Sequence, residues 1–276
     1  CDCECNFMNK ASLKRFLRRL GMIKISDGVR YRLMYYKNYY DNRAFKKKFP
    51  QIAIPPDYMM YESFNLNYRN YYNSGNNTAQ ILKRLFEKYI NFQDTRVLDW
   101  GCGPSRVIRH FSKLCPNSEF FGTDYNSNTV NWNKANIKDV TFELNKLMPP
   151  TKFKSDFFHM IYGMSVFTHL SEENHRNWID ELYRISKNNA ILVLTTHGDV
   201  YRSKLMKSDR LKYDSGQLVV QAKTKEGHRT FAAYHPTETI KSLFADKFEV
   251  IEHISGKVEN WGLSQDKWIV RAVNKL

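Results

Sequence analysis

Residues 97–106 read VLDWGCGPSR, and this stretch decides the fold class. It begins as an apolar strand that runs into an acid, Asp99, and continues into two glycines one residue apart, Gly101 and Gly103. The composition of residues 105–114 then favours a helix. Strand, tight glycine turn and helix is an order typical of nucleotide-binding α/β folds, because glycine has no Cβ to hold a ligand away from the backbone.

The acid beside this turn narrows the class of ligand. A dinucleotide fingerprint, G-x-G-x-x-G, has a third glycine where this chain has Arg106. Asp99 would also place a negative charge beside a pyrophosphate. The turn therefore favours a cationic ligand and argues against a dehydrogenase.

Length and composition are those of an ordinary folded protein. The chain has 276 residues, 42% of them hydrophobic, which is enough for one α/β core with additions. No apolar run reaches the ~18 residues of a membrane span, and no apolar signal-peptide core follows the N-terminus. We expect a cytoplasmic protein, with peripheral attachment to a membrane left open.

The five cysteines predict no metal centre. Cys1, Cys3 and Cys5 are close together but have no His or Cys partner at the spacing of a zinc site. Cys102 lies within the glycine turn, where we expect its small side chain to pack rather than react.

Positive charge is concentrated near the N-terminus. Residues 1–50 hold 13 Lys or Arg and 4 Asp or Glu, which gives +9 of the total charge of +15. An amphipathic helix is predicted over Asn9–Leu20, and Val29–Tyr40 alternates tyrosines with Arg and Lys. This pattern suits an anionic membrane surface, contacted through residues 9–48, or a helical element with a solvated basic face. No nucleic-acid-binding motif accompanies it, so we disfavour RNA or DNA as the partner.

Strand and helix patterns alternate along the rest of the chain. The expected strands are 97–100, 119–125, 140–145, 157–164, 190–196, 248–254 and 267–273. The expected helices are 78–89, 105–114, 127–135, 172–186 and 236–244, the first following a turn at 73–77. We predict an α/β, Rossmann-like sheet of seven strands, mostly parallel, with an antiparallel edge strand and helices on both faces. Residues 1–56 form a basic, Tyr-rich extension that acts as a lid or surface-binding segment, and 57–276 form the main domain.

The carboxyl ends of the parallel strands select the candidate binding residues, because ligands of such sheets bind there. Asp124 ends the second strand about twenty residues after the glycine turn, and its two oxygens can accept both hydroxyls of a ribose. Asn145 ends the third strand and can offer a donor and an acceptor to a base. Leu147 can then cover that base.

An insertion over residues 199–235 follows the fifth strand and includes a predicted hairpin, 217–224 paired with 228–234. It would lie over the ligand, so we expect a second substrate to bind beneath it. A substrate that is methylated on a hydroxyl would need a general base, and histidines at this edge could supply one. Packing alone also explains the presence of each of these histidines. The candidates are His169, His197 and His235, with Tyr61, Tyr68, Tyr201 and Tyr234 as lid or substrate contacts.

Five segments carry a resemblance to a known family: IPPDY (54–58), LDWGCGP (98–104), FGTDYN (121–126), SVFTHL (165–170) and TTHG (195–198). Past Phe45 the chain resembles a bacterial family of class I methyltransferase-domain proteins. The resemblance implies the cofactor S-adenosyl-L-methionine and the product S-adenosyl-L-homocysteine. It implies that Asp99, Gly101 and Gly103 hold the methionine end. The full cofactor-binding set is Asp99, Gly101, Cys102, Gly103, Asp124, Tyr125, Asn145, Leu147 and Ser165.

The chain departs from the family pattern at two places. Ser105 stands where motif I usually has its third glycine. KNNA, residues 187–190, replaces a Pro-Gly-Gly turn, and we expect this change to affect a surface turn only.

Two functions remain open at this point. The first is O-methylation of a small molecule or glycan, as in glycan or natural-product modification. The second is an RNA- or protein-directed methyltransferase, or a cofactor-binding factor, that uses the basic N-terminal segment. We prefer the first because no N/D-P-P-Y acceptor motif follows the fourth strand.

Overall fold

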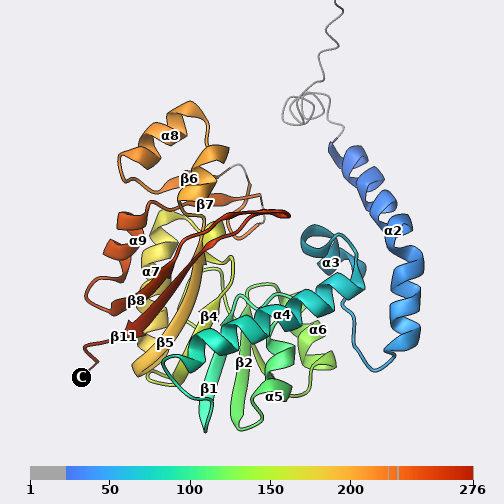
Figure 1. Ribbon diagram of the computed structural model, residues 1–276, viewed down its shortest axis with the longest axis horizontal. Coiled ribbons are helices and arrows are strands. Elements are labelled where there is room, and N and C mark those ends of the chain that lie inside the picture. Colours follow the sequence, from blue (N-terminus) through green and yellow to red (C-terminus); the bar gives the residue numbers. More distant parts are fainter. Residues whose placement is uncertain (1–22, 223, 229, 276) are drawn as a thin grey trace, which may run out of the picture. The chain divides into compact units, whose positions relative to one another are not determined.

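The computed structural model describes residues 23–275 apart from 223 and 229, and these form two compact units (Figure 1). The first unit runs to Tyr71 and the second starts at Tyr72, so the division falls within one helix, α4 (Tyr68–Glu87). The helix predicted over Asn9–Leu20 lies outside the described residues, as do Cys1, Cys3 and Cys5.

The first unit is helical. Its longest element, α2 (Ile23–Lys48), is continuous and includes Val29–Tyr40, for which a helical element is one of the two alternatives above. Side-chain amides join α2 to the turn that follows α3 (Asp57–Phe64). Asn38 Nδ2 donates to the Asn65 carbonyl at 2.9 Å, and Asn42 Nδ2 donates to the Leu66 carbonyl at 2.7 Å. These bonds satisfy backbone carbonyls that the turn leaves without a helical partner.

The second unit is built on a seven-stranded sheet with the order β3-β2-β1-β4-β5-β11-β8. The strands are β1 (Thr95–Trp100), β2 (Ser118–Asp124), β3 (Thr141–Leu144), β4 (Phe158–Gly163), β5 (Ser186–Thr196), β8 (Phe248–Ile254) and β11 (Asp266–Ala272). All pairs from β3 to β5 are parallel. The antiparallel strand, β11, lies between β5 and β8. The predicted Rossmann-like sheet is confirmed.

Helices cover both faces of this sheet (Figure 1). α4, α5 (Phe111–Leu114) and α6 (Ser127–Asn136) contribute to one buried cluster, and α7 (Glu172–Ile185) and α9 (Thr237–Phe244) contribute to the other. The side chains of successive strand residues point to opposite faces of the sheet. Val97 belongs to the first cluster and Leu98 to the second. The glycine turn therefore emerges from a strand that is buried on both sides.

Two predictions beside the glycine turn are wrong. The turn expected at 73–77 is part of the uninterrupted α4. Gly75 is buried there, and a Cβ on it would lie 2.0 Å from the carbonyl oxygen of Arg106. The glycine marks a close approach of two backbones and not a helix stop.

The helix expected over residues 105–114 is replaced by a turn, a short 3-10 helix η1 (Ile108–His110) and the four-residue α5. Gly103 and Ser105 have φ values of +49° and +56°. Left-handed backbone at these positions prevents a helix from starting at Ser105. Residues 187–190, expected as a surface turn, lie within β5, where Asn189 has a φ of +62°.

The insertion has a small core of its own. It comprises η3 (Asp199–Lys204), α8 (Lys207–Asp214), β6 (Val219–Gln221) and β7 (Ala232–Tyr234). The predicted hairpin is present but shorter than expected, with β6 and β7 antiparallel. A second short hairpin, β9 (Val258–Glu259) and β10 (Gly262–Leu263), lies between β8 and β11.

Gly75→Ala should destabilise the protein by about 1–3 kcal/mol, although alanine is the better helix former, because the new methyl group overlaps the Arg106 carbonyl. Asn77→Ala, at an exposed position of the same helix, is the matched control and should be neutral or slightly stabilising. Urea unfolding of both variants checks this. A stabilised Gly75→Ala would show that α4 does not approach Arg106 as described.

Candidate functional site

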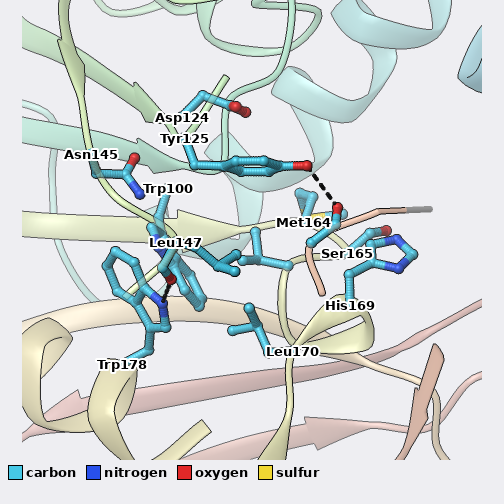
Figure 2. A pocket seen from close by; sticks show the side chains of 13 residues that line it. Trp100, Asp124, Tyr125, Asn145, Leu147, Met164, Ser165, His169, Leu170 and Trp178 are labelled. Carbon is cyan, nitrogen blue, oxygen red and sulfur yellow. Dashed lines mark hydrogen bonds between the residues drawn. The ribbon is translucent and has the colours of Figure 1, made fainter. Parts of the chain in front are cut away.

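A cavity of about 220 Å³ opens at the carboxyl edge of the sheet (Figure 2). It is lined from the ends of the first four strands, the segment after β4, α7 and one loop of the insertion. Seven residues predicted from the sequence line it: Gly101, Asp124, Tyr125, Asn145, Leu147, Ser165 and His169. Lining residues that the sequence reasoning missed include Trp100, Met164, Trp178 and Gly227. Trp100 lies within the stretch 97–106 but carries no predicted role, the other three belong to no quoted motif, and only the fold brings the four together.

The glycine turn is held against the end of β2. The backbone N–H groups of Gly101 and Cys102 both donate to the Thr123 carbonyl at 2.9 Å. Gly101 has a φ of +72°, and a Cβ there would lie 2.5 Å from Cγ2 of Val166. Only glycine therefore fits between the ends of β2 and β4 while its backbone borders the cavity.

Asp124 connects β2 to the same turn. One carboxylate oxygen, Oδ2, accepts from the Gly103 N–H at 2.9 Å, and Oδ1 accepts from the Asn126 N–H at 2.8 Å. Burial raises the pKa of the Asp124 carboxyl, and these backbone donors oppose that rise. Each carboxylate oxygen keeps acceptor capacity for a donor in the cavity.

Asp99 and Cys102 support the turn from behind and are not among the cavity-lining residues. Asp99 is buried, and its Oδ2 accepts from the Tyr162 hydroxyl at 2.9 Å. Burial raises the pKa of Asp99 to about 7. The Cys102 thiol is also buried, which raises its pKa well above the ordinary value and keeps it protonated. Cys102 therefore packs, as expected.

Asn145 presents an amide at the end of β3. Its Oδ1 accepts from the Thr123 hydroxyl at 2.7 Å, and its Nδ2 donates to the Lys146 carbonyl at 2.6 Å. An amide has a second hydrogen and a second lone pair, so one donor and one acceptor remain. Below it, Trp178 Nε1 donates to the Leu147 carbonyl at 2.9 Å (Figure 2).

The insertion crosses the cavity at Gly227. The Tyr125 hydroxyl donates to the Gly227 carbonyl at 3.0 Å (Figure 2), and the Gly227 N–H donates to the His169 carbonyl at 2.9 Å. The adjacent Glu226 carboxylate accepts from the Ser171 N–H at 2.5 Å and from Asn174 Nδ2 at 2.8 Å. The loop is thus attached to the N-terminus of α7 and to β2, on either side of the cavity.

Of the three predicted histidines, His169 alone lines the cavity. Its Nδ1 lies 2.8 Å from the Phe231 carbonyl oxygen, which can only accept, so Nδ1 carries the proton. Burial lowers the pKa of His169 below its ordinary 6.5. The ring is therefore neutral near pH 7, with a lone pair on Nε2.

His197 and His235 lie in the packing around the insertion. The ring of His197 stacks on Tyr201 with centroids 4.1 Å apart, and its Nδ1 lies 3.0 Å from the Ala233 carbonyl. Burial lowers the pKa of His197 to about 4. His235 is fully buried, with its Nε2 2.8 Å from Nε2 of His175. The structure does not bring either ring to the cavity lining.

The predicted tyrosines divide between the two units. Tyr201 and Tyr234 belong to the core of the insertion, where the Tyr201 hydroxyl donates to the Leu263 carbonyl at 2.7 Å. Tyr61 and Tyr68 belong to the first unit, and the Tyr68 hydroxyl donates to Asp57 at 2.9 Å.

Ser165 has a φ of +62°, and its hydroxyl donates to the Gln265 side chain at 3.0 Å. The cavity wall is thereby joined to the segment that follows β10.

Within residues 23–275, excluding 223 and 229, no three His, Cys, Asp or Glu side chains are grouped so as to hold a metal ion. In the same part of the chain no helix is both long enough and apolar enough to cross a membrane.

Comparison with known proteins identifies the fold. The family described as "Methyltransferase domain" matches residues 97–189, and no curated protein matches the chain. Solved structures similar to it include a SAM-dependent methyltransferase from Methanosarcina mazei, with 18% identity over 69% of this chain and 98% of that one, at a TM-score of 0.53.

Two further structures cover more of the chain. The PH0226 protein from Pyrococcus horikoshii is 17% identical over 80% of this chain and 100% of its own, with a TM-score of 0.54. Magnesium protoporphyrin IX methyltransferase from Synechocystis, solved with bound SAH, is 16% identical over 85% and 97%, also at 0.54. These identities establish a shared fold. Residues 97–189 form a methyltransferase domain within this fold, so the protein is a transferase.

Proposed function

We propose that the enzyme O-methylates a small-molecule or glycan acceptor. This acceptor would bind beneath the insertion that residues 199–235 form. The observation that carries this proposal is the position of His169. This neutral histidine lines the same cavity as Asp124 and Asn145, under the loop at Gly227. A cofactor site, a proton acceptor and a cover are therefore available in one place.

The residues of the cavity suit S-adenosylmethionine. Asp124 would accept from the ribose hydroxyls with the lone pairs that its two backbone bonds leave available. Asn145 would meet the adenine edge, with Leu147 and Tyr125 on either side. The glycine turn would approach the methionine end, supported by Asp99 from behind. When bound, the cofactor supplies a methyl group that is already activated, so the protein's main task is to align the acceptor atom with it.

His169 would take the proton of the acceptor hydroxyl on Nε2. The Phe231 carbonyl fixes the tautomer that leaves this nitrogen unprotonated, and burial keeps the ring neutral. His197 lacks a place in the cavity lining, and His235 is already committed to His175. These contacts favour His169 among the three candidates.

One other class of acceptor, RNA or protein, is the alternative to this proposal. An RNA- or protein-directed enzyme would use the basic N-terminal segment, residues 1–56, to hold a macromolecule. The loop at Gly227, bonded to Tyr125 and to His169, covers this cavity, which favours a small acceptor, such as a sugar ring. We also propose that the N-terminal segment brings the enzyme to an anionic membrane surface.

Asp124→Asn should weaken S-adenosylhomocysteine binding by about 10–100-fold, because a hydrogen bond to a charged acceptor contributes about 1.5–3 kcal/mol. Isothermal calorimetry checks this. Asp139→Asn, at an exposed position after α6, removes the same charge and should leave affinity unchanged. Equal affinity of the two variants would remove Asp124 from the cofactor site.

His169→Gln should lower kcat by about a hundredfold or more and leave S-adenosylhomocysteine affinity unchanged. The folded pKa of His169 lies below 6.5, so activity should be present above that pKa and lost as the pH falls through it. This acid limb should vanish in the variant. His228→Gln, an exposed histidine of the same loop, is the control. An unchanged pH profile would exclude His169 as the base.

An acceptor panel tests the function itself. S-adenosylhomocysteine release would be followed with nucleotide sugars, oligosaccharides, phenols, RNA and peptides, each as a separate class. We expect turnover with a hydroxyl compound among the first three. Turnover with RNA or peptides alone would favour the competing function, and failure to bind the cofactor would end the proposal.

A further inference from the structure

A narrow apolar stripe runs along the exposed side of α2. Val29, Leu33, Tyr36 and Tyr40 are spaced by four, three and four residues, which places them within about 60° of one another around the helix axis. All four side chains are exposed, Leu33 at 66%, Tyr36 at 72% and Tyr40 at 82%. The opposite side of α2 is buried at Asn38 and Phe45. The helix is therefore apolar on the side that its own unit leaves open.

Positive charge flanks this stripe on both sides. By the same geometry Arg32 and Arg43 lie along one margin, and Arg30, Lys37 and Lys48 lie along the other. Residues 28–48 contain seven Lys or Arg and one acid, Asp41. Long cationic side chains beside an exposed apolar stripe can extend to anionic groups while their stems remain on the apolar side.

A groove of about 490 Å³ adjoins the stripe on the side of Arg30 and Lys37. Leu33 of the stripe and these two cations line it, together with side-chain amides that include Asn38 and Asn67. Asn67 Nδ2 donates to Asn38 Oδ1 at 3.0 Å, so the amide wall is fixed in place. Both hydrogens of Asn38 Nδ2 are donated to backbone carbonyls, so the groups that can receive a phosphate are the two cations and the second hydrogen of Asn67 Nδ2.

We infer that α2 lies flat on an anionic lipid surface, with its stripe at the boundary of the acyl chains and a headgroup phosphate in this groove. Tyrosine and aliphatic side chains suit the interface, and cations beside them suit the headgroups. The inference rests on the surface contact proposed above and deepens it by naming the helix face and the lipid group.

Other occupants fit the same face less well. A second copy of α2 would bring the same cations into contact with these, and like charges repel. The basic residues 1–22 would meet the same repulsion. Nucleic acid would use the cations and the tyrosines, but Val29 and Leu33 offer nothing to a phosphate backbone.

The test is co-sedimentation of the full chain with vesicles of phosphatidylcholine alone or with about one-third phosphatidylserine. We expect binding to the anionic vesicles only, weakened as salt rises from about 0.1 M to about 0.5 M. The assay contains neither cofactor nor acceptor, so a failure to bind vesicles can be distinguished from a failure of methyl transfer. Equal binding to neutral vesicles, or no binding, overturns the inference.

Two sets of variants locate the contact. Leu33→Ser with Tyr36→Ser and Tyr40→Ser should weaken vesicle binding about tenfold or more through lost apolar contact. The matched control is Met206→Ser with Leu211→Ser, which removes side chains of 61% and 66% exposure at α8. Arg30→Gln with Lys37→Gln should weaken vesicle binding by about twenty-five-fold, at about fivefold per cation. Its control, Lys152→Gln with Lys154→Gln, removes two exposed cations elsewhere and should have little effect.

Three results would overturn the assignment to lipid. The stripe variant binding vesicles as tightly as its control would show that α2 is not the contact. Tighter binding of RNA than of vesicles, lost in the same variants, would make nucleic acid the occupant. A dimer in lipid-free solution that the stripe variant dissociates would make a second copy the occupant. Circular dichroism and S-adenosylhomocysteine affinity should match the unmodified chain, which establishes that the variants fold.

Discussion

The site depends on two hydrogen bonds to one oxygen. The Thr123 carbonyl accepts from the N–H groups of both Gly101 and Cys102, which draws the glycine turn against the end of β2. Asp124, the next residue, then reaches the Gly103 N–H. Because the turn and the acid are positioned by the same strand end, the backbone that borders the cavity and the carboxylate that faces it cannot move independently. The buried Asp99–Tyr162 pair supports this arrangement from behind.

The insertion completes the site and explains the state of its histidine. The Phe231 carbonyl, which fixes the tautomer of His169, belongs to the segment just before β7. Glu226 meanwhile accepts from the Ser171 N–H at the start of α7, where an N-terminal carboxylate is favoured by the helix dipole. The segment that covers the cavity thus also sets the chemistry of the side chain inside it.

The sequence predicted the sheet and most of the cavity because both follow from local patterns. Buried strands are apolar runs, and their carboxyl ends carry Asp124 and Asn145. Prediction from the sequence failed where contacts between distant segments determine the structure. Gly75 resembles a turn residue in sequence but sits in a helix against Arg106. Nothing in the sequence near Trp178 or Gly227 indicates that these residues line the cavity. Nothing near His235 indicates that its ring contacts His175 and does not line the cavity. Such contacts depend on packing between elements far apart in the chain.

The peptide group at Gly227 joins two sides of the cavity. Its carbonyl accepts from Tyr125, beside the strand end that carries Asp124, and its N–H donates to the backbone of His169. A Cβ at this residue would lie 3.0 Å from Leu147, and φ is +81°, so the chain has little choice of residue here. Both bonds belong to one small loop, so a displacement of this loop from the cavity would have to break the bond to Tyr125 and the bond to His169 together.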